Sequence, residues 1–250
     1  MITNDVKNVE MLPSLYSLFL NPAGRVLYDL ILYKICDTEY LVEYDATGIE
    51  YVHKHLTMYR LRKNVQIEPS SDMSVWVIYK QNNTGSTDEN FDLEDIYNHL
   101  NKISDIVKYQ LGIGEGILDH PPGNCLPFET NVDLLNGVSF TKGCYIGQEM
   151  TAKSNFVFSV RKRLMPVILV EMNSYPIFLP ECNILNDKQK KMGRLRSRLG
   201  QHGLGLLKFE DCMKSNFLQL QGYDIKLKAI WPNWWPKSLS SNKNEHIFSL

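Results

Sequence analysis

The pattern of apolar and polar positions predicts a hairpin followed by a helix in the first part of the chain. Strong turn residues at 21–25 precede a long apolar run at 26–33, and a second run follows at 39–44. Two such runs joined by a short connection predict a β-hairpin. From residue 48 to 61 the apolar positions recur mostly every three or four residues, and this spacing predicts an amphipathic helix.

The pattern then returns to strand character before it weakens. Residues 65–68 and 75–79 predict two short strands. Residues 81–90 are polar and rich in turn-forming side chains, so we expect a surface loop there. Apolar positions with helical spacing predict a helix at 93–109.

Short apolar runs separated by turns dominate the chain beyond Arg161. Many short strands of this kind predict a small β-barrel. Three tryptophans near its end are expected to close the barrel core. The predicted fold class is therefore α+β followed by an all-β barrel. We expect an α+β domain at 1–160, a C-terminal β-barrel at 161–237 and a tail at 238–250.

Composition narrows the class of protein. The chain is 44% hydrophobic and 22% charged with a net charge of -1, which is ordinary for a folded protein and argues against a nucleic-acid binder. Its apolar stretches fall short of the ~20 residues that span a bilayer, so no membrane span is expected. The start, with a helix-capping pattern at 3–5 and no leader pattern, suggests that an upstream strand and a targeting peptide are missing.

The five cysteines are widely scattered and include no CxxC pair. An odd count without tight spacing is poor material for a disulfide framework or for a zinc or iron–sulfur site built by this chain alone. We therefore expect the protein to work in a reducing compartment, where cysteines stay as free thiols.

One cysteine lies in a distinctive setting. Gly143 directly precedes Cys144 and Gly147 follows it, and glycines allow sharp turns and close approach of another molecule. Lys142 supplies a positive charge that favours the thiolate, and a helix starting at Gln148 would add to this effect. A thiolate serves both nucleophilic attack and metal ligation. A small buried hydrophobe in a tight turn remains an equal alternative from the residues alone.

The run 142–149, KGCYIGQE, resembles the hallmark of the folate-binding YgfZ-type proteins and their mitochondrial counterparts, which act late in iron–sulfur cluster assembly. That family is similar in fold to the aminomethyltransferase (T-protein) of the glycine cleavage system. The likeness covers most of the chain, and its further blocks are 3–5, 19–29, 127–131, 161–164 and 234–236.

The resemblance implies aminomethyltransferase-like subdomains around a central hole, a C-terminal β-barrel and a place in the mitochondrial matrix. It implies a factor for four-iron four-sulfur proteins, in which Cys144 ligates an iron–sulfur cluster. Because a two-iron cluster takes four protein ligands, Cys144 would share it with a partner, an A-type carrier of the mitochondrial ISC machinery. Supporting motif residues are Lys142, Gly143, Tyr145, Gly147, Gln148 and Glu149.

The alternative is a tetrahydrofolate-dependent one-carbon (aminomethyl) transferase that uses the same cavity. The Glu129 carboxylate could accept a bidentate pair of hydrogen bonds from a pterin, although capping backbone amides is an equal role for it. Asn131, Asn21 and Arg25 are the further candidates for folate. A cysteine nucleophile would need a base, and no histidine lies near Cys144 in sequence. His120 and His202 could reach it only through folding.

Other motifs have structural interpretations. His53 and His55 would diverge on a helix, so solvated side chains are favoured over a metal site. Residues 112–117 lack the full glycine pattern of a phosphate loop and predict a tight connection. The basic run 188–198 predicts a solvated hairpin turn with Gly193 at its bend, with docking of an acidic partner or a folate polyglutamate tail as the alternative.

Overall fold

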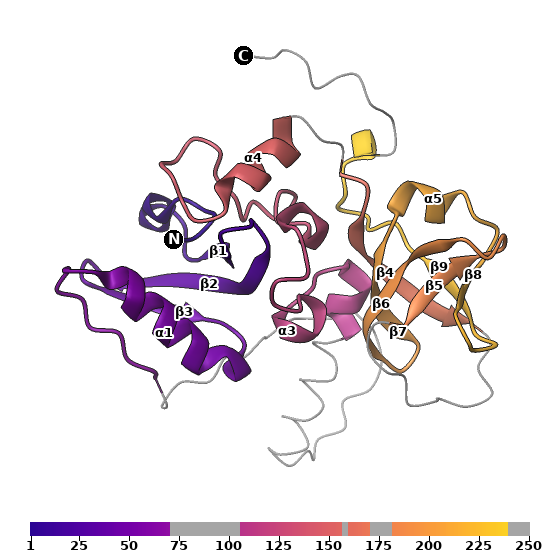
Figure 1. Cartoon of the computed structure of the whole chain (residues 1–250), viewed down its shortest axis with the longest axis horizontal. Helices are drawn as coiled ribbons and strands as arrows, with labels where there is room; N and C mark the ends of the chain where they lie inside the picture. Colours follow the sequence, from indigo (N-terminus) through magenta and orange to yellow (C-terminus); the bar gives the residue numbers. More distant parts are fainter. Residues whose placement is uncertain (71–105, 157–159, 171–181, 240–250) are drawn as a thin grey trace, which may run out of the picture.

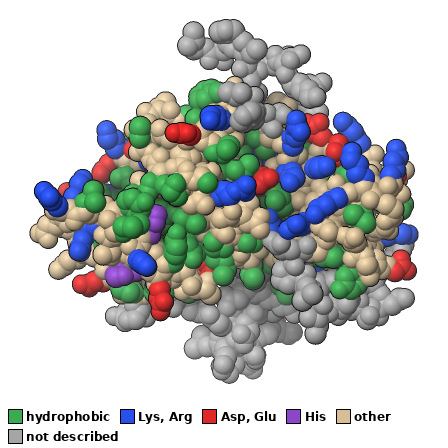
Figure 2. All heavy atoms as spheres, in the orientation of Figure 1, with side chains coloured by type: hydrophobic (Ala, Val, Ile, Leu, Met, Phe, Trp, Pro, Cys, Tyr) green, Lys and Arg blue, Asp and Glu red, His purple; other side chains and the backbone are tan. Residues whose placement is uncertain are grey.

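The computed structural model describes residues 1–70, 106–156, 160–170 and 182–239. A small sheet with a covering helix lies at one end and a β-barrel at the other, with short helices and loops between them (Figure 1). Hydrophobic side chains gather over the sheet half of the face seen in Figure 2, and Lys and Arg side chains over the barrel half.

The N-terminal part of the chain forms a three-stranded antiparallel sheet in the order β1-β2-β3. Its strands are β1 (Leu15–Leu20), β2 (Val26–Cys36) and β3 (Glu39–Glu43). Helix α1 (Ile49–Arg60) follows, and its Val52 packs into the apolar core of the sheet. The predicted hairpin and helix are confirmed, whereas β1 was not predicted although it is an almost unbroken apolar run.

The predictions for residues 65–109 can be compared with the structure only in part. The prediction of a strand at 65–68 is wrong, because those residues have no regular structure. The predictions at 75–79 and 81–90 lie outside the described residues, as does most of the helix predicted at 93–109. The described end of that helix, residues 106–109, is helical, and the helix continues to residue 111. At the start of the chain, Asp5 caps the short 3-10 helix η1 (Val6–Glu10) by accepting from the Lys7 amide at 3.1 Å.

The middle of the chain is held to the sheet region by hydrogen bonds from backbone amides to aspartate side chains. It contains α3 (Gly116–Asp119), η3 (Pro127–Thr130) and α4 (Gln148–Phe156). Asp29 of β2 accepts from the Gly116 amide at 3.1 Å, and Asp45 accepts from the Ile117 amide at 3.0 Å. A Cβ at Gly116 would lie 2.4 Å from the Asp45 carboxylate, so this tight connection requires glycine.

The second half is a closed barrel in the order β4-β7-β6-β5-β8-β9. Helix α5 (Phe209–Met213) follows β7, and the short η4 (Lys237–Leu239) ends the described chain. As expected, Trp231, Trp234 and Trp235 pack on the barrel core. The strands are β4 (Arg163–Val170), β5 (Asn183–Asn186), β6 (Lys191–Leu199), β7 (His202–Leu207), β8 (Leu218–Leu220) and β9 (Lys226–Ala229).

The basic run was only partly interpreted correctly. Its turn lies between β5 and β6, where Gln189 has φ +57°, and Gly193 lies inside β6 rather than at the bend. A Cβ at Gly193 would meet the Leu206 carbonyl oxygen at 2.0 Å, so this glycine permits close strand packing. No helix in the described ranges is long and apolar enough to cross a membrane.

Candidate functional site

Cys144 is an exposed residue of the loop that precedes α4. Figure 1 shows this loop running into α4. Its thiol is free and exposed, which excludes the interpretation as a buried hydrophobe. Gly143 is exposed as well, and a Cβ built on it would meet no atom within 4 Å. The backbone at Gly143 therefore faces open space.

The rear of the same loop is packed and braced. Tyr145 packs against an apolar cluster that includes Leu20 and Val26, and this burial raises the pKa of its phenol. The Tyr145 amide donates to the Gln148 side-chain oxygen at 3.0 Å. Helix α4 begins at Gln148, the start considered in the sequence, and Glu149 is exposed in its first turn.

Gly147 has a different use from the one expected. Its φ of +78° is a left-handed conformation, and a Cβ there would lie 2.5 Å from the Asn21 carbonyl oxygen. The close approach at Gly147 is thus made by the turn between β1 and β2 of this chain. A Cβ at Gly24 in that turn would in return lie 2.5 Å from Cβ of Met150 on α4.

Lys142 contacts the N-terminal segment. Its ammonium donates to the Asn4 carbonyl at 2.6 Å and to the Ile2 carbonyl at 2.9 Å, and lies 5.3 Å from the centre of the Tyr145 ring. Burial lowers the pKa of this ammonium. The contacts make Lys142 an anchor of the loop, and its influence on the Cys144 thiol stays a prediction.

The four residues expected to bind folate have structural partners. The Asn21 side-chain oxygen accepts from the Arg25 amide at 2.9 Å, and the Arg25 guanidinium donates to the Asn124 carbonyl at 2.9 Å. The Glu129 carboxylate accepts from the Leu126 amide at 3.0 Å. The capping role given as the alternative for Glu129 is therefore confirmed.

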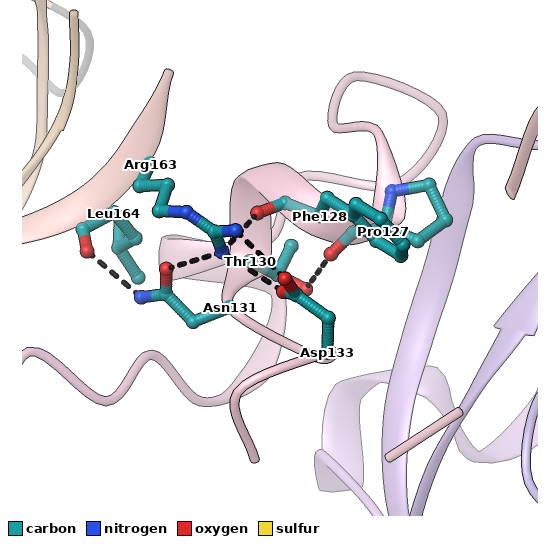
Figure 3. Close-up of polar contacts among 7 residues, drawn as sticks. All are labelled: Pro127, Phe128, Thr130, Asn131, Asp133, Arg163 and Leu164. Carbon is teal, nitrogen blue, oxygen red and sulfur yellow. Dashed lines mark hydrogen bonds and ion pairs between the residues drawn. The ribbon is translucent and has the colours of Figure 1, made fainter. Parts of the chain in front are cut away.

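Asn131 is fully buried, and its side chain is engaged within the fold. Its φ is +64°, and its amide nitrogen donates to the Leu164 carbonyl at 2.8 Å (Figure 3). Beside it the guanidinium of Arg163, 2% exposed, forms a bidentate ion pair with Asp133 at 2.8 and 2.7 Å. These contacts join η3 to β4 and fix the middle of the chain against the barrel.

A pocket of about 250 Å³ lies between the start of η3, α4 and residues 160–162, which lead into β4. Sequence reasoning named only Glu129 among its lining residues. The others were missed because three separate segments supply them, although the basic pair at 161–162 was visible in the sequence. The lining residues are Leu126, Phe128, Glu129, Met150, Ser154, Val160, Arg161 and Lys162.

The histidines considered in the sequence lie on α1, at the end of α3 and in β7. His53 is exposed and His55 is buried between Phe19 and Tyr59, so the two rings diverge as predicted, although His55 is not solvated. His120 is buried beside Gly114, and His202 lies in β7. Within the described ranges, no three His, Cys, Asp or Glu side chains gather as metal ligands would.

The protein has an aminomethyltransferase-like fold with a C-terminal closed β-barrel. Residues 161–237 match the family described as "CAF17, C-terminal beta-barrel domain". The crystal structure of glycine cleavage system aminomethyltransferase T from Bartonella henselae matches with a TM-score of 0.55 at 12% identity. That match covers 89% of this chain and 76% of the other, and it confirms the predicted fold.

Curated relatives give the family. The human protein "Iron-sulfur cluster assembly factor IBA57, mitochondrial" is 32% identical over an alignment that covers 88% of this chain and 72% of the human one. The mouse protein of the same name is 34% identical with the same coverage. The chain belongs to the IBA57 family, and the resemblance found in the sequence is confirmed.

Proposed function

We propose that this protein is an iron–sulfur cluster assembly factor that works in the mitochondrial matrix. Its family carries the assignment, because its human, mouse and fungal relatives are all named as mitochondrial factors of this kind. The observation in the structure that supports it is the exposed thiol of Cys144 beside Gly143, whose backbone faces open space.

The other cysteines are less suited to hold a cluster. Cys125 and Cys212 are buried, and burial raises the pKa of the Cys212 thiol to about 12. Cys182 is half-buried, and its pKa is also raised by burial. Cys36 is exposed, but it lies at the end of β2 rather than in the motif. Cys144 is therefore the best ligand that this chain offers.

A single thiolate supplies one of about four protein ligands that a two-iron cluster takes. The proposal is that an A-type carrier supplies the remaining ligands and that the shared cluster is cargo for four-iron four-sulfur client proteins. Gly143 leaves space for the carrier. Gln148 holds the loop from behind, and Lys142 anchors it to the N-terminal segment.

Reconstitution with a partner tests the ligand role. The protein is mixed with an A-type carrier, iron and sulfide, and cluster absorbance is measured in the isolated complex. Cys144→Ser is expected to abolish the shared cluster, whereas the control Cys36→Ser, which removes the other exposed thiol, is expected to retain it. Equal cluster absorbance for the two variants would contradict the role of Cys144 as a cluster ligand.

Tetrahydrofolate needs a separate test. Glu129 and Asn131 are engaged in fold contacts, so we do not propose a one-carbon transferase. Calorimetric titration with tetrahydrofolate compares wild type with Glu129→Gln, whose side-chain oxygen can still accept from the Leu126 amide. Tight binding that this variant loses would favour the folate alternative over our assignment.

A further inference from the structure

We propose that the pocket and the aromatic stack beside the Cys144 loop form a docking surface for an acidic segment of a partner protein. The segment would place an apolar side chain in the pocket and carboxylates on its rim. This inference rests on the proposed function, since it names the chemistry of the partner that would complete the cluster. The docking surface consists of Leu126, Phe128, Phe140, Met150, Lys153, Phe156, Val160, Arg161 and Lys162.

Three phenylalanines run from the interior to solvent. Phe128 is buried, Phe140 is 42% exposed and Phe156 is 74% exposed. The ring centres are 6.1 Å apart at each step, in edge-to-face geometry. Exposed aromatic side chains beside a pocket are the groups that carry binding energy at protein interfaces.

The size of the pocket suits a side chain. Its volume of about 250 Å³ lies below the roughly 300–1,000 Å³ of typical small-molecule sites. Leu126, Met150 and Val160 line it together with Phe128, so an apolar group would be desolvated against apolar neighbours. An inserted apolar side chain from a partner would fit in this space.

The charges favour an acidic partner. Arg161 and Lys162 line the pocket and are exposed, whereas the adjacent Arg163 is buried and neutralised by Asp133. The ion pairs among the described residues use neither Arg161 nor Lys162.

Further charges on the surface agree with this preference. Lys153 is exposed on α4, close in sequence to Phe156. Of the carboxylates nearby, Glu129 is used as a cap, and only Glu149 is exposed on α4. Lys153, Arg161 and Lys162 thus outnumber the carboxylates of Glu129 and Glu149, and this excess of positive charge favours an acidic partner.

The docking surface lies close to the cysteine along the chain. Phe140 precedes Cys144 by four residues, a span of at most about 14 Å even when fully extended. A partner seated on Phe140 would therefore bring its own ligands near the exposed thiol.

Titration of the ¹⁵N-labelled full chain with peptides tests this proposal by NMR, which detects weak binding. The probe is a twelve-residue peptide containing Leu, Phe and five Glu, and its control has Gln in place of every Glu. We expect the Glu peptide to shift the amides of Phe140, Phe156 and Arg161, with affinity at least about tenfold above that of the Gln peptide.

Charge-removing variants locate the peptide on the molecule. Arg161→Ala/Lys162→Ala is expected to weaken the Glu peptide about tenfold, whereas the matched pair Lys188→Ala/Lys190→Ala, in the exposed β5–β6 turn, is expected to leave it unchanged. Cys144→Ser should bind the peptide normally, so loss of cluster sharing and loss of docking can be told apart.

Several outcomes would overturn the proposal. These are absence of shifts on the docking surface, equal binding of the two peptides, or equal effects of the two double variants. Displacement of the peptide by tetrahydrofolate, with folate binding itself lost in Arg161→Ala/Lys162→Ala, would make the pocket a small-molecule site instead.

Discussion

The ammonium of Lys142 donates to the backbone carbonyl of Asn4 at 2.6 Å across 138 residues of sequence. This contact fixes the loop that carries Cys144 to the N-terminal segment. That segment is itself held to β1 and to the loop, since the Thr3 hydroxyl accepts from the Leu18 amide and donates to the Gly137 carbonyl. The exposed thiol is thus supported by residues from both ends of the first domain.

Removing the Lys142 ammonium should destabilise the protein. We expect Lys142→Met to lower the free energy of unfolding by about 2 kcal/mol, because two charge-assisted hydrogen bonds are lost. Urea unfolding measures the change. The control Lys153→Met removes an exposed charge from α4 and should change stability by less than about 0.5 kcal/mol. Equal effects of the two variants would contradict the anchoring role.

The two glycines that flank Cys144 should respond differently to alanine. Gly147→Ala forces a side chain into a left-handed conformation against the Asn21 carbonyl, so a loss of about 2 kcal/mol or more is expected. Gly143→Ala enters open space and should be nearly neutral for stability. Thermal unfolding of both variants checks this difference. A neutral Gly147→Ala would show that the turn at 21–24 does not hold the loop.

The buried ion pair between Arg163 and Asp133 should be costly to break. Asp133→Asn leaves the guanidinium with an uncompensated charge 2% exposed to solvent, and a loss of about 3–5 kcal/mol is expected. The pair of Lys34 with Glu10 is the control, since its carboxylate side is largely exposed and Glu10→Gln should cost less than about 1 kcal/mol. Similar losses of unfolding free energy for the two variants, measured with urea, would argue against an ion pair that holds the η3 region to β4.

Stability should fall at alkaline pH partly through Cys212. Burial raises the pKa of its thiol from 9.0 to about 12, so the unfolded chain releases this proton first. Its contribution is complete below pH 9 and is lost as the pH rises toward 12, by about 1.4 kcal/mol per pH unit. In Cys212→Ala the unfolding free energy, measured with urea from pH 8 to 10, should fall less steeply with pH than in the wild type. An unchanged slope would contradict a neutral buried thiol.

Apolar periodicity and turn residues predicted those elements whose formation depends on residues close in sequence. The hairpin, α1 and the C-terminal barrel follow from periodicity and turn chemistry. Gly193 was misplaced because a glycine can serve a bend or a close strand contact, and only the position of Leu206 distinguishes them.

The site was predicted less completely than the fold. Cys144 was singled out by a motif confined to a few residues, whereas its exposure was left open until the structure showed it. The pocket was not predicted, since its walls come from segments that meet only on folding. The burial of Asn131 likewise depends on Leu164 and Arg163, which lie more than 30 residues away in sequence.

Alkylation of individual cysteines tests the central claim most directly. The complex with an A-type carrier is treated with N-ethylmaleimide before and after cluster formation, and modification of Cys144 and Cys36 is measured by peptide mass spectrometry. Both thiols are exposed in the protein alone. We predict that cluster formation protects Cys144 and leaves Cys36 reactive. Modification of Cys144 that is unchanged after the cluster has formed would contradict its role as a ligand.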